Sequence, residues 1–161
     1  MSSVLCHVAN QYQFQTPLAV VITNRKPERD FVKHLVKPEN SAVVDGWIKN
    51  HDSQFYSIEF SWKKGQHNRR GLFNPDFFVK IGKDVLVVEI KDDPEKDDPS
   101  PENKGKWRWA DRHFKRLNKL QSEATYHLTF LSPCDYDLFF EKLRSGDYSA
   151  FASHLDRLLS S

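Results

Sequence analysis

The feature that most constrains the fold is a pair of β-rich runs joined by a very short connection. The runs FFVKI and DVLVVEIK stand on either side of Gly82-Lys83, and two residues make one of the commonest β-hairpin connections. The run Val85–Val88 is entirely apolar, without the alternation of a strand that has one face in water. It therefore predicts a central strand that is covered on both faces.

Periodicity and turn residues predict the elements around this hairpin. A strand is expected over 18–23 and a helix over 27–36, which begins at a proline. An amphipathic helix is expected over 106–121, because Trp107, Ala110, Phe114 and Leu117 share one face. The remaining predictions are a short helix over 41–50, a strand over 55–62, a polar turn over 63–71, an exposed loop over 92–103, a strand over 125–131, and one or two closing helices over 135–143 and 149–159.

This order of elements predicts an α/β fold in which helices flank a mixed central β-sheet. A chain of 161 residues with 39% hydrophobic residues has the size of one ordinary domain, expected over residues 1–161. No leader and no apolar run long enough for a bilayer is visible, so we expect a soluble, cytoplasmic protein without membrane contact. Cys6 and Cys134 lie outside any CxxC or Cys/His cluster, which argues against disulfides and structural zinc.

Charged residues meet where the apolar hairpin ends. Glu89 and Lys91 are two positions apart on the second strand, so their side chains point to one face. Asp76 lies on the first strand, and pairing through the short turn brings it close to Glu89. Two partly buried carboxylates repel each other unless a cation separates them, and such oxygen ligands suit Mg²⁺. The alternative is that Glu89 and Lys91 form only a salt pair, worth at most about 1 kcal/mol.

The string NPDFFVKIGKDVLVVEIK resembles the signature of the PD-(D/E)XK nuclease superfamily. Pro75-Asp76 is followed, after twelve residues, by Glu89-Ile90-Lys91. Further stretches resemble the C-terminal nuclease region of type III restriction enzyme subunits and related superfamily 2 helicases: PERDF, FYSIEFSWKKG, FNPDFF, VEIKDD, ENKGK, HFKRLN and FLSP. Together these stretches span most of the chain from Pro27 to Pro133.

The resemblance implies a restriction-endonuclease-like core and a metal-dependent endonuclease that hydrolyses DNA, in restriction or phage defence. It implies catalytic roles for Asp76, Glu89, Lys91 and Glu28. Asp76, Glu89 and the Ile90 main-chain carbonyl would bind Mg²⁺, with Mn²⁺ as a substitute. From its position alone, Glu28 is equally explained by the helix dipole, which favours a carboxylate in the first turn.

The chain departs from these relatives in lacking a GxxxxGK[ST] phosphate loop. We therefore expect either a domain excised from a larger helicase-nuclease or a free-standing relative with a helicase or ATPase partner. Cleavage of both strands with one centre per chain would require a homodimer. The competing hypothesis is a non-catalytic, nuclease-like module that binds DNA or docks a helicase.

Basic residues predict where DNA would bind, in two groups beside the hairpin. The polar turn carries Lys63, Lys64, Arg69 and Arg70, and the helix that faces substrate in the similar nucleases carries Lys104, Lys106, Arg108 and Arg112. The stripe Arg108, Arg112, Lys115 and Lys119 is equally interpretable as the solvated face of an amphipathic helix. Six acidic residues fall between Asp92 and Glu102, and this segment is interpreted as a solvated loop or, alternatively, a gate over the site.

Overall fold

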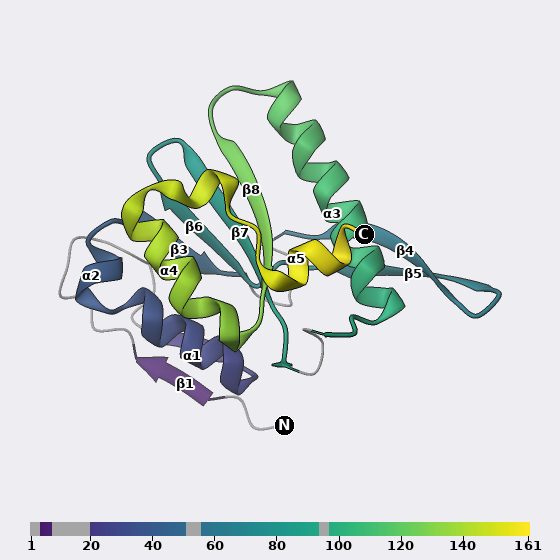
Figure 1. Cartoon of the computed structure of the whole chain (residues 1–161), viewed down its shortest axis with the longest axis horizontal. Coiled ribbons are helices and arrows are strands. Elements are labelled where there is room, and N and C mark those ends of the chain that lie inside the picture. The colour runs from purple at the N-terminus through teal and green to yellow at the C-terminus, as the bar shows by residue number, and fades with distance from the viewer. Residues whose placement is uncertain (1–3, 8–19, 51–55, 94–96) are drawn as a thin grey trace.

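The computed structural model describes residues 4–7, 20–50, 56–93 and 97–161. The elements in chain order are β1 (Val4–His7), β2 (Val20–Thr23), α1 (Lys26–Leu35), α2 (Pro38–Ser41), β3 (Gly46–Lys49), β4 (Ile58–Lys64), β5 (His67–Phe73), β6 (Phe77–Ile81), β7 (Asp84–Ile90), α3 (Pro101–Leu120), β8 (Thr125–Leu131), η2 (Pro133–Asp135), α4 (Tyr136–Ser145), η3 (Asp147–Ala150) and α5 (His154–Leu159) (Figure 1). Within these ranges, no helix combines the length and apolar character needed to cross a bilayer.

The central sheet is mixed, as predicted. Its strand order is β3-β6-β7-β8, with antiparallel β3-β6 and β6-β7 pairs and a parallel β7-β8 pair. A parallel pair requires a long crossover, and α3 forms this crossover between β7 and β8. The predicted hairpin through Gly82-Lys83 is confirmed, and β7 is an interior strand whose residues 86–90 are all buried. The class is therefore α/β, with helices flanking a mixed sheet.

Alternation along β7 divides the core into two layers. Leu86, Val88 and Ile90 belong to a cluster that contains Phe31 of α1 together with the aromatic residues of α4. Val87 belongs to the other cluster, with Ala110 and Phe114 of α3 and Leu155 of α5. Figure 1 shows α1 and α4 together at one flank and α3 apart from them. Glu89 and Lys91 share the parity of Val87, so they belong to the face covered by α3.

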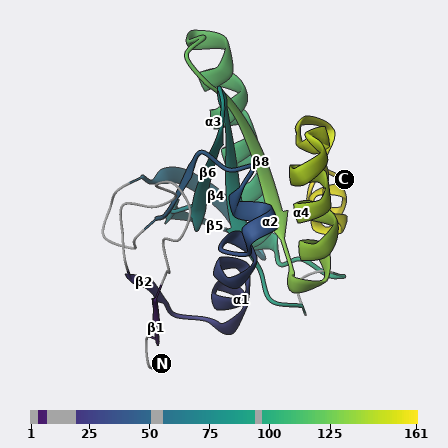
Figure 2. The ribbon, with the colours of Figure 1, turned by 90° about the vertical axis from the view of Figure 1, so that its left-hand side faces the viewer.

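A second hairpin, β4-β5, packs against α3 and extends beyond it (Figure 1). The prediction of a polar turn over 63–71 is wrong, since the turn is short and β5 already begins at His67. Residues 67–70 are all exposed, so no hydrophobic alternation identifies them as a strand. Their pairing comes from the main chain of β4. A further sheet of two strands, β1-β2, lies on the side away from α4 in Figure 2.

Two further element predictions need correction. The helix expected over 41–50 is wrong, because α2 ends at Ser41 and β3 pairs with β6 at the sheet edge, where Trp47 is buried. The α3 helix begins at Pro101 rather than at Lys106. Ser100 caps it by accepting a hydrogen bond from the Asn103 N–H at 3.3 Å. The predicted loop over 92–103 therefore ends at Ser100, and its residues 94–96 lie outside the described ranges.

A buried carboxylate connects α5 to the sheet and to α3. Asp156 accepts hydrogen bonds from the Phe130 N–H at 2.8 Å, the Thr129 hydroxyl at 2.6 Å and the Trp107 indole N–H at 3.2 Å. It also accepts from the Ser153 N–H at 3.2 Å, within its own helix cap. Burial raises the pKa of Asp156 although these donors oppose the shift. A short C-terminal helix thus fixes parts of β8 and α3 at once.

Candidate functional site

The hairpin of β6 and β7 brings three predicted site residues together. Phe77 pairs with Val88, so Asp76 and Glu89 lie beside this pair, at the end of the hairpin away from the Gly82-Lys83 turn. The Asp76 carboxylate accepts a hydrogen bond from the Ile90 N–H at 2.7 Å. The Lys91 ammonium donates to Glu89 Oε1 at 2.7 Å. The predicted juxtaposition of Asp76, Glu89 and Lys91 is therefore present.

Glu28, from the first turn of α1, reaches the same place. Its side chain is 5% exposed and accepts hydrogen bonds from the Asn24 N–H at 3.2 Å and from Arg25 Nε at 2.9 Å. The ammonium of Lys49 on β3 lies 3.7 Å from Glu28 Oε2. This carboxylate therefore has charged partners on two elements, which goes beyond a favourable position in the helix dipole.

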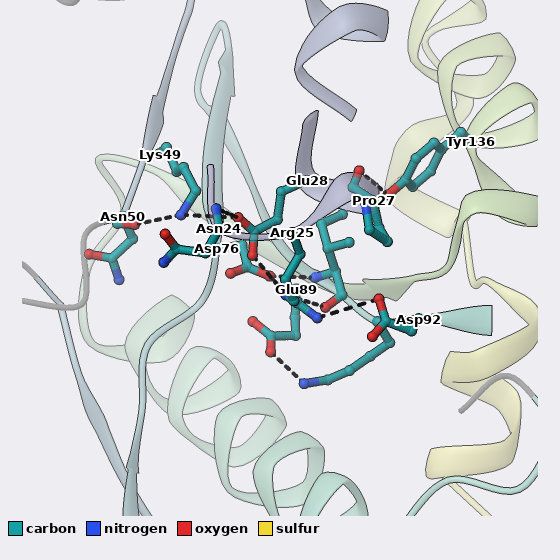
Figure 3. Close-up of polar contacts among 12 residues, drawn as sticks. Asn24, Arg25, Pro27, Glu28, Lys49, Asn50, Asp76, Glu89, Asp92 and Tyr136 are labelled. Carbon is teal, nitrogen blue, oxygen red and sulfur yellow. Dashed lines mark hydrogen bonds and ion pairs between the residues drawn. The ribbon is translucent and has the colours of Figure 1, made fainter. Parts of the chain in front are cut away.

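Arg25 is a site residue that the sequence did not indicate. Its Nη2 atom lies 2.9 Å from the Ile90 carbonyl oxygen and 3.4 Å from Asp76 Oδ2, and its Nη1 atom lies 3.9 Å from Asp92 Oδ1. Figure 3 shows the guanidinium among Glu28, Asp76 and Asp92. Arg25 thus places a positive charge between two of the predicted metal ligands. The only signal in the sequence is its position three residues before Glu28, which suits an ion pair on one helix.

The site combines three carboxylates with three cations: Asp76, Glu89 and Glu28 with Arg25, Lys91 and Lys49. Burial raises the pKa of Asp76 well above its usual range, and the charges of Glu89 and Glu28 raise it further, while the Ile90 N–H and Arg25 act in the opposite direction. Burial works to lower the pKa of Lys91, but the charge of Glu89, the hydrogen bond to it and the charge of Asp76 together outweigh burial, so the pKa is raised. Lys91 therefore stays protonated, and the ionised form of Asp76 is disfavoured although Arg25 lies beside it.

These residues fit a hard divalent cation. Glu89 Oε2 is buried without a hydrogen-bond partner among the described residues. Mg²⁺ is bound in proteins through one or two carboxylates and keeps several waters, so Asp76, Glu89 and the Ile90 carbonyl would be enough. No three His, Cys, Asp or Glu side chains in the described ranges are grouped closely enough to hold an ion by themselves. The cation now among them is the Arg25 guanidinium.

A polar hollow of about 260 Å³ opens beside the carboxylates. Arg25, Lys91 and Lys106 line it together with Asn103, Ser100, Asp92 and Glu102. Lys106 is 3.1 Å from Glu102. A phosphate that entered this hollow would compete with Glu89 and Glu102 for Lys91 and Lys106.

The predicted DNA-binding residues do not form one surface. Lys106 lines the polar hollow described above, whereas Lys63, Lys104, Arg108 and Arg112 line a second hollow of about 400 Å³ between α3 and the β4-β5 hairpin. Lys64, Arg69 and Arg70 are exposed on the hairpin and line neither hollow. The second hollow thus combines one basic residue of the predicted turn, Lys63, with three of the helix.

Comparison of the chain with family models, with curated proteins and with solved structures gave no match in any of the three.

Proposed function

We propose that the chain is a metal-dependent endonuclease that hydrolyses phosphodiester bonds in DNA. The observation that carries the proposal is the meeting of Asp76, Glu89, Lys91 and the Ile90 carbonyl at the end of one hairpin, beside a hollow lined by cations. Carboxylates with an adjacent ammonium are the groups that metal-assisted hydrolysis of a phosphodiester requires. The accessory acid in this proposal is Glu28.

The arrangement of elements supports a restriction-endonuclease-like core. An N-terminal helix contributes Glu28, an antiparallel hairpin contributes the other acids, and α3 leads to a strand parallel to β7. These acids occupy the positions that the similarity to type III restriction enzyme subunits implies. The proposal extends to a role in restriction or phage defence, with a helicase partner or a longer parent chain providing the motor.

The chain's own residues would hold the phosphate and stabilise its charge. Arg25, Lys91 and Lys106 face one hollow, and a phosphate there would accept hydrogen bonds from fixed cations. A bound Mg²⁺ would supply a water of lowered pKa and polarise the phosphate. Because Lys91 keeps its proton, it can donate to an oxygen that gains charge as the bond breaks.

The test is nicking of a supercoiled plasmid in Mg²⁺ or Mn²⁺, with EDTA as the blank. We expect wild-type nicking, and a loss of about 100-fold or more in Lys91→Ala, the scale seen when one transition-state donor is removed. Asp76→Ala should be equally impaired, while Lys80→Ala, an exposed lysine on β6, serves as the matched control. Nicking that survives both site substitutions would eliminate this assignment.

A second candidate is a non-catalytic module that binds DNA or docks a helicase. The observation in its favour is that Arg25 lies beside Asp76 and already donates a hydrogen bond to the Ile90 carbonyl, one of the oxygens that would bind the metal. In that case the protein would bind plasmid but leave it intact in both metals, and Lys91→Ala would change only stability.

A further inference from the structure

The second hollow combines aromatic surface with positive charge. About 400 Å³ in volume, it lies between the β4-β5 hairpin and the first half of α3. Six of its lining residues carry its chemistry: Trp62, Lys63, Lys104, Arg108, Trp109 and Arg112. Its size falls within the range of about 300–1,000 Å³ that is usual for small-molecule sites.

Close packing of α3 on the hairpin fixes the walls of this hollow. A Cβ atom on Gly105 would come within 3.0 Å of both the Ser61 carbonyl oxygen and Trp62 Cβ, so glycine permits the approach. The Trp62 indole stacks on Phe60, with ring centroids 4.9 Å apart and an angle of 15° between the planes. Trp62 is therefore held in place before any ligand arrives.

The described residues that line the hollow carry positive charge and no carboxylate. Among the described residues, Lys63, Lys104 and Arg108 form no ion pair, whereas Lys106 and Lys115 on the same helix are paired with Glu102 and Asp111. The Arg112 guanidinium lies 5.9 Å from the centroid of the Trp109 ring, a cation-π distance. Unpaired cations gathered in one concave site favour an anionic ligand.

We propose that this hollow binds an unpaired nucleotide of a DNA strand, with its base on the tryptophans and its phosphates on the lysines and arginines. Indole faces bind bases by stacking only when the bases are not stacked in a duplex, and stacking tolerates any base. This inference rests on the proposed function, because it specifies the class of DNA that the proposed endonuclease would cut. The substrate is then DNA with a single-stranded segment rather than uniform duplex.

The position of the hollow relative to the carboxylates agrees with this substrate. Lys104, Gly105 and Arg108 face the hollow, while Glu102, Asn103 and Lys106, on the same turns of α3, face the hollow beside Lys91. Both sites therefore lie around one helix, whose diameter with side chains is about 10–12 Å. A strand that leaves its base on Trp109 can continue around α3 to the carboxylates.

The experiment measures binding of the full chain in EDTA, where no metal-dependent cleavage occurs. Fluorescence anisotropy of a labelled oligo(dT) single strand is compared with that of a labelled duplex of equal length. We expect the single strand to bind about 10-fold more tightly than the duplex. Trp109→Ala should weaken it by about 10-fold, as loss of one stacking partner does, and Trp109→Phe should restore most of the affinity. Arg108→Ala should reduce the salt dependence of single-strand binding by about 0.7 in log-log slope.

The control is Leu120→Ala, an exposed residue at the far end of α3, which should bind as wild type. Circular dichroism melting verifies that each variant is folded. Equal affinity for duplex and single strand, or full binding by folded Trp109→Ala, would overturn the inference. Because binding is measured without metal, failure to nick plasmid refutes the proposed function separately from this site.

Discussion

Arg25 and Asp76 together determine the charge of the site. Asp76 is surrounded by Glu89 and Glu28, and the Arg25 guanidinium that opposes them lies 3.4 Å from its carboxylate. The Arg25 side chain is 30% exposed, so solvent screens its attraction to the Asp76 carboxylate. An arrangement that keeps Asp76 ionised is thus costly for the folded protein, as is common where function rather than stability decides the residue.

Asp76→Asn should stabilise the metal-free protein at neutral pH. The pKa of Asp76 is raised on folding, so the associated stability is fully present below the ordinary aspartate pKa, about 3.9. It is lost as pH rises through the raised value. Urea unfolding in EDTA should show that the advantage of the variant grows from pH 4.5 to pH 8. The amide oxygen of the substituted asparagine can still accept from the Ile90 N–H.

Asp137→Asn, with a side chain that is 99% exposed, is the control and should show no such growth. Addition of Mg²⁺ should stabilise the wild type and not Asp76→Asn, because a ligand that binds only the folded state raises its stability. A stability difference that stays constant with pH would contradict the assigned origin of the shift.

Among the helices and strands, those that bury an apolar face could be predicted from the sequence, and those without such a face could not. The β6-β7 hairpin, α1, most of α3 and β8 could be predicted, because each buries a periodic apolar face. The β5 strand could not, since its exposed residues pair through the backbone alone. For the same reason the hairpin made Asp76, Glu89 and Lys91 predictable, but the position of Arg25 depends on how α1 packs against the sheet end.

A second prediction concerns the contact between α3 and the β4-β5 hairpin. Gly105→Ala should improve helix propensity by about 1 kcal/mol, yet lower the free energy of unfolding by about 1–3 kcal/mol overall, as overpacking does. The clash is with the main-chain oxygen of Ser61, which cannot rotate away. Urea unfolding measures the effect.

Gly65→Asn is the matched control. Gly65 has a φ of +62° in the turn of the same hairpin, and a Cβ atom added there would meet no other atom within 4 Å. Asparagine tolerates this backbone region better than most residues. If Gly105→Ala is as stable as this control, the helix and hairpin are less closely packed than the structure indicates.

Across the whole molecule, the two core layers meet at β7, which ends at the carboxylates. The layer of α1 and α4 brings Glu28 to the site, and Arg25 lies directly before α1. The layer of α3 and α5 contains Phe60 and Phe114, and α3 lines both hollows. Glu89 and Lys91 also lie on this second face, so loosening α3 should affect the acids as well as the aromatic hollow.

Asp156→Ala tests how firmly α5 holds β8 and α3. It leaves buried donors on Thr129, Phe130 and Trp107 without an acceptor, at a cost of about 3 kcal/mol or more in the free energy of unfolding. Asp147→Ala, which removes an exposed carboxylate, is the control. Chemical unfolding gives the stability, and a loss below about 1 kcal/mol would contradict the role assigned to this carboxylate.

The attachment of α5 through Asp156 also has a consequence for proteolysis. The segment between η3 and α5 is short, and a protease that cut there would detach the acceptor that Trp107 and β8 share. The nicked molecule would keep the β6-β7 hairpin with its acids but would hold α3 less firmly. A chain cut at this point should therefore lose the proposed binding of a single strand while its carboxylates remain in place.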